Sequence, residues 1–196
     1  AVGQNAMAWG GGIRNDGTTI LSGTAEIRDC HATGNSVDGG GISAGGLLNI
    51  SGDVKIIGCT SDGSSDTMSI GYVGSTISGG TFDGSIRNAG GTISGGMFYG
   101  SITNTNGGEI KGIIVTYKDG NADYAKQVLQ SGGTATKPNE PARDGYVFLG
   151  WYNGDAAYNF TDPVTGDMTL TAKWVELKDK TADFTASDGG AEAIAL

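Results

Sequence analysis

The chain has 196 residues, a formal net charge of −9 and an isoelectric point near 4.4. This acidic balance excludes the basic patch that nucleic-acid binding requires, and it disfavours docking on anionic lipid. No stretch approaches the ~20 consecutive apolar residues of a membrane span, so we expect no direct membrane insertion. The chain opens inside a repeat without a signal-peptide pattern, which we interpret as a processed or truncated piece of a larger protein.

Internal repeats dominate the first 111 residues, and repeats override local predictions of secondary structure. Residues 10–34 and 39–63 match without a gap at a shift of 29, and residues 74–89 and 90–105 match at a shift of 16. The shifts align apolar residues, namely Ile13 with Ile42, Ile27 with Ile56, Cys30 with Cys59, Ile77 with Ile93 and Phe82 with Phe98. The chain therefore contains two kinds of repeat unit.

Each unit holds short runs of β-prone residues separated by Gly-Gly, Asp-Gly or Ser-Gly, which predict strands joined by tight turns. Units this short cannot bury a core alone, so they must stack on their neighbours. We predict that residues 1–111 form a parallel β-solenoid whose equivalent residues lie ~4.8 Å apart, with buried Ile and Phe pairs and with Glu26 over Lys55 on the solvent side. A disordered Gly/Ser-rich linker is the alternative, which the regular ladders disfavour.

The repeat pattern GGGI…SG…I…C resembles the right-handed β-helix repeats of bacterial autotransporter passenger domains and polymorphic outer-membrane proteins. This resemblance covers about residues 8–111 and implies a right-handed β-helix on the cell surface. Its motifs are low in complexity, so they say more about fold than about function.

Residues 112–176 differ in composition, with all three prolines and most aromatic residues of the chain. They carry DGYVFLGWY at 144–152, YNF at 158–160 and LTAKW at 170–174. This pattern resembles the Listeria–Bacteroides repeat, the type of the internalin B repeats, and the resemblance implies a compact β-grasp-like spacer or interaction module. Large side chains should form its core, with a ligand-stacking platform as the alternative: Tyr146, Phe148, Trp151, Phe160, Leu170 and Trp174.

The two parts should be separate folding units that meet only near residues 111–114, because they share no repeat. Residues 122–130 are compatible with one short helix. Residues 177–196 lose aromatic residues and should form a linker or the start of a further segment.

An enzyme is the rival interpretation of a β-helix, because polysaccharide-cleaving enzymes bring carboxylates together on one face across adjacent coils. The repeat register opposes this, since it places Asp16 opposite Gly45, Asp29 opposite Gly58, Asp38 opposite Thr67 and Asp83 opposite Tyr99. His31 is the only histidine and has no acid–base pattern beyond Asp29 beside it, so we expect a solvated loop residue. We therefore predict no catalytic residue and no enzyme activity.

Metal and cofactor sites are not expected either. Asp119, Asn121 and Asp123 begin like a calcium loop, but Tyr124 stands at the glycine position and Gln130 at the position of the bidentate glutamate. A polar β-turn is the simpler interpretation, and we predict no metal-binding or cofactor-binding residue.

The only two cysteines, Cys30 and Cys59, lack metal-ligand spacing. We expect them to stack between coils. Stacked Cβ atoms lie ~4.8 Å apart whereas a disulfide needs about 3.8 Å, so a bond between them is disfavoured but stays open.

These features favour a non-catalytic adhesin or stalk module, secreted or on the bacterial cell surface. A glycan-binding or carbohydrate-active β-helix protein is the alternative, for which Tyr72 and Tyr99 would be the best exposed aromatic residues. The expected partner is a host or bacterial surface protein or glycan, not nucleic acid, and the chain should be a monomer.

Overall fold

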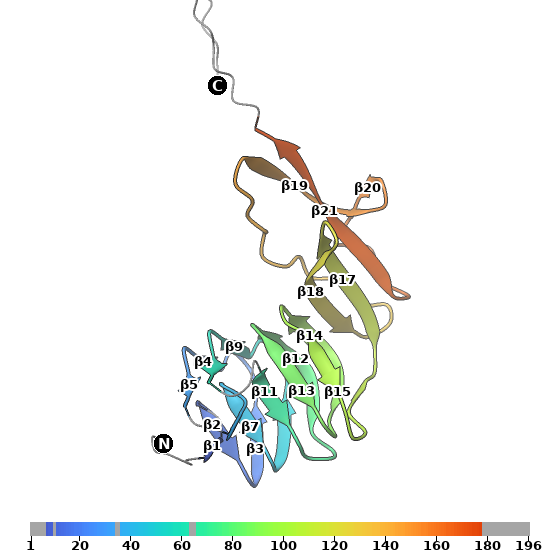
Figure 1. Cartoon of the computed structure of the whole chain (residues 1–196). Coiled ribbons are helices and arrows are strands. Elements are labelled where there is room, and N and C mark those ends of the chain that lie inside the picture. The colour runs from blue at the N-terminus through green and yellow to red at the C-terminus, as the bar shows by residue number, and fades with distance from the viewer. Residues whose placement is uncertain (1–6, 10, 34–35, 63–65, 178–196) are drawn as a thin grey trace, which may run out of the picture.

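The computed structural model describes residues 7–9, 11–33, 36–62 and 66–177, and every regular element in these ranges is a β-strand (Figure 1). The prediction of an all-β chain is confirmed for this part of the sequence. The strands first build a stack of coils and then enter a mixed sheet. The expected linker lies outside the described residues from position 178 onward.

The first two coils repeat with a period of 29 residues. The first coil holds β2 (Ile13–Asn15), β3 (Thr18–Leu21), β4 (Glu26–Arg28) and β5 (His31–Ala32). Their parallel partners are β7 (Ile42–Ala44), β8 (Leu47–Ile50), β9 (Lys55–Ile57) and β10 (Thr60–Ser61). At the same shift β1 (Met7–Trp9) pairs with β6 (Ser36–Asp38). The predicted register is confirmed, including exposed Glu26 over exposed Lys55.

The later coils are narrower because one strand replaces two. Their strands are β11 (Asp66–Ile70), β12 (Thr76–Phe82), β13 (Ser85–Asn88), β14 (Thr92–Phe98), β15 (Ile102–Asn104) and β16 (Glu109–Ile110). The seven-residue β12 pairs with β8 at one end and with β9 at the other. It also pairs with β14, matching Ile77 with Ile93 and Phe82 with Phe98, so the predicted 16-residue register is confirmed.

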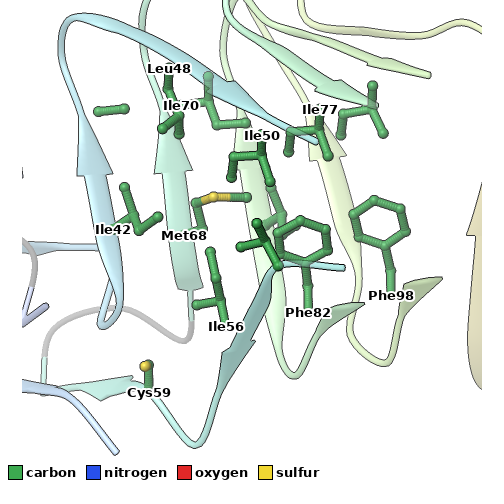
Figure 2. Packing of buried hydrophobic residues seen from close by; sticks show 14 of the residues in the cluster. Ile42, Leu48, Ile50, Ile56, Cys59, Met68, Ile70, Ile77, Phe82 and Phe98 are labelled. Carbon is green, nitrogen blue, oxygen red and sulfur yellow. The ribbon is translucent and has the colours of Figure 1, made fainter. Parts of the chain in front are cut away.

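Inward-pointing apolar side chains fill the coils as ladders (Figure 2). Phe82 and Phe98 are fully buried and stack with their ring centroids 4.9 Å apart and their planes 9° apart. Ile56 is also fully buried. The predicted burial is wrong for Ile13 and Ile27, which are only partly buried, because the described residues cover this coil mainly from the side of the second coil.

Buried asparagine amides, which sequence reasoning missed, hold the turns of the coils. Asn88 is fully buried, and its Nδ2 donates hydrogen bonds to the carbonyl of Gly91 (2.9 Å) and to Oδ1 of Asn104 (2.9 Å). In the first coil Asn15 is buried, and its Nδ2 donates to the carbonyl of Leu47 in the next coil at 2.8 Å. These bonds satisfy polar groups that would otherwise be costly to bury.

The remaining strands form a mixed sheet. They are β17 (Ile113–Asp119), β18 (Ala122–Leu129), β19 (Tyr146–Asn153), β20 (Ala156–Ala157) and β21 (Met168–Glu176), in the order β20-β19-β21-β17-β18. The possible helix over residues 122–130 is wrong. These residues form β18, whose two edges pair with β14 and β17 and whose two faces are both covered toward its end. Tertiary pairing therefore overrides the weak local preference for helix.

The stack and the mixed sheet are joined by strand pairing. β18 lies antiparallel to β14, so one twelve-stranded sheet extends from β3 in the first coil to β20 (Figure 1). The expectation that the two parts meet only near residues 111–114 is wrong. Val128 of β18 packs into the core of the coils, whereas Met97 of β14 packs into the core of the mixed sheet. The two cores therefore lie on opposite faces of one sheet.

The core of the mixed sheet is aromatic, as predicted. Trp151 and Leu170 are buried, and the Trp151 ring meets buried Tyr117 edge-on with centroids 5.1 Å apart. The other expected core residues, Tyr146, Phe148, Phe160 and Trp174, are only partly buried. They lie at the edge of this core, where the sheet is too small to cover large rings completely.

Candidate functional site

A groove of about 570 Å³ lies along the outer face of the coils and ends against the mixed sheet. Beneath it, one line of residues runs from strand to strand, each the register partner of the next: Glu26, Lys55, Thr81, Met97 and Gln127. These residues alternate along their strands with inward-facing core residues, so their side chains point out of the coils. At the last coil β18 and the mixed sheet cover this face. The groove is therefore a product of both parts of the chain.

Glycines form the floor of the groove. A Cβ atom at Gly79 would lie 2.7 Å from the carbonyl oxygen of Gly52 in the preceding coil. Gly80 has a φ of 103°, a conformation that favours glycine, and the register of β12 against β14 shifts between Ser78 and Thr81. The absence of side chains here keeps the coils in close contact and leaves the groove open.

The groove is lined by polar groups of several kinds. Threonine hydroxyls come from Thr24, Thr81 and Thr136, and charged groups come from Glu26, Asp53 and Lys55. Glu26 forms an exposed ion pair with Arg28 at 2.9 Å. Together these hydroxyls, carboxylates and an ammonium group offer hydrogen-bond donors and acceptors to a polar, hydroxyl-rich ligand.

The closed end of the groove is held by Gln127. Its Oε1 accepts a hydrogen bond from the backbone N–H of Thr136 at 2.8 Å, and its Nε2 donates to the Thr136 hydroxyl at 3.2 Å. The hydroxyl of Tyr117 donates to the carbonyl of Thr136 at 2.8 Å. Burial is the main reason that the pKa of Tyr117 is raised well above its ordinary value. The loop at this end is thus fixed to the core beneath it.

The stacked coils do not bring the carboxylates of Asp16, Asp29 and Asp83 opposite other carboxylates. Gly58 lies against Asp29, since a Cβ atom at Gly58 would lie 2.7 Å from the Asp29 carboxylate, and Gly45 lies against Asp16. Asp83 follows Phe82, the partner of Phe98, so Tyr99 lies opposite it. The Asp38 side chain lies outside the described residues. Within the described residues the register thus pairs glycine or tyrosine with each of these carboxylates, as predicted.

His31 makes contacts between coils at an exposed corner. Its Nδ1 lies 2.8 Å from the Thr60 hydroxyl, and its Nε2 lies 3.0 Å from the Asp62 carboxylate. The exposed fractions of the His31 and Asp62 side chains are 49% and 53%. Water therefore competes for these contacts, which fits the predicted solvated residue.

The two tyrosines proposed as exposed aromatic residues differ. Tyr72 is 49% exposed. Tyr99 is partly buried at the junction, where its hydroxyl accepts a hydrogen bond from the N–H of Asn139 at 2.9 Å and its ring meets Tyr124 edge-on at 5.8 Å. The prediction that Tyr99 is an exposed stacking residue is therefore wrong, because the mixed sheet covers the last coil.

The calcium-like triplet lies at a hairpin, as the turn interpretation predicted. Asp119 pairs with Ala122 across the turn, and its carboxylate accepts a hydrogen bond from the indole N–H of Trp174 at 2.8 Å. Asp123 forms ion pairs with Lys126 at 2.9 Å and with Lys118 at 3.5 Å. A hydrogen bond from Lys126 is the main cause that lowers the pKa of Asp123. Both carboxylates are thus engaged in holding the sheet.

Both cysteines are free thiols on adjacent coils. Cys59 is buried, and its Sγ donates to the carbonyl of Ile57 at 3.4 Å, whereas Cys30 is partly exposed. Burial is the main cause that raises the pKa of Cys59 to about 11. Cys59 is therefore protonated and unreactive at neutral pH.

No group of three or more His, Cys, Asp or Glu side chains among the described residues could hold a metal ion. A helix long and apolar enough to span a membrane does not occur in this part of the chain.

Comparison with known proteins finds two relatives in Evansella cellulosilytica. One, described as a Gly-rich membrane protein, is 35% identical over 86 residues, which cover 41% of this chain and 10% of the relative. The other, described as a membrane protein, is 33% identical over 86 residues, covering 41% of this chain and 13% of the relative. The chain thus spans only about a tenth of the length of these relatives.

A family model gives the more specific match. The model of the Listeria–Bacteroides repeat domain matches residues 114–173, a range that covers almost the whole mixed sheet. This match confirms the resemblance drawn from the aromatic motifs at residues 144–152 and 170–174. Residues 114–173 of this chain are similar to the Listeria–Bacteroides repeat domain.

Proposed function

We propose that this chain is a non-catalytic stalk or adhesin module of a cell-surface or secreted bacterial protein. In this proposal residues 1–111 form a right-handed parallel β-solenoid of the autotransporter type, and residues 112–176 form a β-grasp-like repeat module. The observation that carries the proposal is the strand pairing of β14 with β18. It continues the sheet of the coils into the repeat module, so the two parts can act as one rigid spacer.

Two comparisons support a surface location, and the charge of the chain supports a monomer. The relatives are described as membrane proteins, and Listeria–Bacteroides repeats are modules of bacterial surface proteins. A net charge of −9 favours solubility and keeps copies apart, consistent with a monomer. The partner we propose is a surface protein or glycan of a host or of another bacterium.

A stalk should be stiff and inert. Small-angle scattering of the full chain tests the first property, because two parts joined by a flexible hinge would give a broad distribution of lengths. Incubation with pectins, alginate and glycosaminoglycans tests the second. Turnover that disappears in Glu26→Gln, which removes the groove carboxylate opposite Lys55, would overturn the non-catalytic assignment.

Glycan binding in the groove is the second candidate function. It is favoured by the threonine hydroxyls that line the groove and by the glycines that leave it open. A glycan array with the full chain, followed by titration of any hit, tests it. Thr81→Trp should fill the groove and abolish binding, whereas Thr103→Trp on exposed β15 should not. Equal loss in both variants, or no hit on the array, would argue against this second function.

A further inference from the structure

The last coil leaves one of its strands without a neighbour on the outer edge. That side of β14 is covered by β16 and β18. Among the described residues β15 pairs only with β13, so it ends the five-stranded sheet. This edge lies well inside the sequence, at the point where the chain leaves the coils for the module, and Thr103 and Asn104 on it are exposed. The last coil can therefore accept a single further strand beside β15.

The backbone of β15 presents unused groups to this edge. In a parallel pair, alternate residues direct their backbone groups to the same neighbour. Ser101 and Thr105 point to β13, because the carbonyl of Ser101 accepts from the N–H of Ile86 at 2.8 Å and the N–H of Thr105 donates to the carbonyl of Asn88 at 2.9 Å. The backbone groups between them, at residues 102 and 104, therefore point to the free edge. Such an edge is a template for strand addition.

The strands of this sheet share one side-chain pattern. Each strand has one large apolar residue at the same register position: Ile13, Ile42, Met68, Ile86 and Ile102. An asparagine follows two residues later in β2, β13 and β15. Met68 and Ile86 are fully buried, whereas Ile102 is only partly buried. The apolar ladder is thus incomplete at β15.

A cavity of about 440 Å³ lies beside Ile102, where the coils meet the module. Its apolar lining comes from Ile102 and Ile110 of the last coil and from Ile114 and Met168 of the module. The module wall is fixed by the N–H of Ile114, which donates to the carboxylate of Asp167 at 2.8 Å. An apolar side chain that a further strand places over Ile102 would pack against this lining and lose contact with water.

Polar side chains beside the apolar ladder also stack from strand to strand. The hydroxyls of Ser85 and Ser101 lie 2.9 Å apart. Nδ2 of Asn88 donates to Oδ1 of Asn104 at 2.9 Å. Because this bond uses Oδ1 of Asn104, its Nδ2 is the group that can donate to the amide oxygen of a next asparagine. The edge thus favours a hydroxyl and an amide at defined positions.

We propose that the free edge of β15 binds an extended segment of a partner protein by parallel strand addition, and that this segment has the pattern Ser or Thr, Ile or Val, any residue, Asn. Parallel pairing in register places its apolar residue over Ile102 and its asparagine over Asn104, as β13 and β15 pair now. Residues 178–196 contain no asparagine and do not supply this pattern. Binding at this edge does not require the groove to hold a glycan.

A peptide with the sequence Gly-Ser-Ile-Thr-Asn-Thr-Gly, capped at both ends, tests the edge by titration into the isotope-labelled full chain. Amide shifts should be largest at Ile102 and Asn104, whose N–H groups point outward, and small at Thr103, whose N–H points to β13. Exchange of the Ile102 and Asn104 amides should slow at least about tenfold at saturation. A matched control peptide carries Asp in place of Ile and should cause no shift at these residues, because its carboxylate would meet the apolar lining.

Asn104→Ala tests the amide pairing separately. The variant should bind the asparagine peptide about fivefold more weakly, the effect of one amide hydrogen bond. Its affinity for a second peptide, with Ala in place of Asn, should equal that of the unmodified chain. An equal loss of affinity for both peptides would refute the pairing of the two amides.

A fusion covers the case in which the free peptide binds too weakly for detection. The peptide is attached to the end of the full chain through a Gly/Ser linker of about 40 residues, which gives a local concentration on the order of millimolar. Unchanged exchange at Ile102 and Asn104 in this fusion would overturn strand addition at β15. Equal shifts with the Asp peptide, or shifts confined to other strands, would do the same. A dimer of the unmodified chain that protects Ile102 and Asn104 would make a second copy the occupant and would also overturn it.

Discussion

Two methionines offer a direct test of how the coils and the repeat module share one sheet. Met68 is fully buried in the coils, and Met97 is 7% exposed in the core of the module although it belongs to a strand of the coils. Replacing either one by alanine removes the same atoms. Loss of a buried methionine side chain costs about 2 to 5 kcal/mol, and we expect about 2 to 3 kcal/mol at each position.

The location of the loss should differ between the two variants. Met97→Ala should speed amide exchange mainly in β17 and β21 of the module, by roughly 30-fold for a loss of 2 kcal/mol. Met68→Ala should speed exchange mainly in β7 and β13, which flank it in the coils. Segment-resolved hydrogen exchange of the intact chain measures both.

The matched pair makes the reasoning refutable. If Met97→Ala leaves β17 and β21 as protected as in the unmodified chain, then the module core is not built on the outer face of the last coil. If both variants speed exchange uniformly over all strands, the chain unfolds as one unit and the two cores do not respond separately. Only a loss confined to the module agrees with the packing of Met97.

Three other outcomes are expected. Gly46→Ala should destabilise the chain by about 1 to 3 kcal/mol in urea titration, because a Cβ atom there would lie 2.7 Å from the backbone N of Gly17 in the preceding coil. Gly17→Ala should change stability by less than about 1 kcal/mol, because none of the described atoms lies within 4 Å of a Cβ atom at Gly17. Iodoacetamide at pH 8 should modify partly exposed Cys30 much faster than buried Cys59, because a pKa of about 11 leaves roughly one Cys59 thiolate in a thousand. Folding raises the pKa of Cys59, so the free energy of unfolding should fall as the pH rises from about 9 to about 11. The fragment 112–176 should melt below the module in the full chain, because it lacks Met97, and an equal melting temperature would support the predicted independent unit.

The sequence was most informative where stacking forces a residue to lie over its own equivalent. Ile27 over Ile56 and Phe82 over Phe98 followed from the shift alone, because parallel coils repeat both the spacing and the side-chain direction. The repeat could not tell how much of each residue is covered. Ile27 and Ile56 have the same type and pattern, and only the position of the first coil in the stack leaves Ile27 partly exposed.

Long-range pairing of a non-repeated strand was not predictable. Residues 122–129 carry no sign that one edge will pair with β14 and the other with β17. Their composition, with Ala, Lys and Gln, is compatible with a helix, and the choice of strand comes from partners distant in sequence. The groove was missed for the same reason, since Thr136 and Gln127 close it from outside the repeats.

At the junction, neighbouring residues of β14 belong to the two different cores, so this end of the stack differs from the first coil. Along β14 the inward residue Phe98 belongs to the coils and the outward residue Met97 belongs to the module, so the module packs on the outside of the last coil while β18 lies along its edge. A strand that pairs on both edges and packs on both faces leaves little room for another coil to join β14. Among the described residues the first coil has no such strand, and its inward residues Ile13 and Ile27 are only partly buried. The packing of β18 and of the module on β14 therefore obstructs extension of the stack where the module begins.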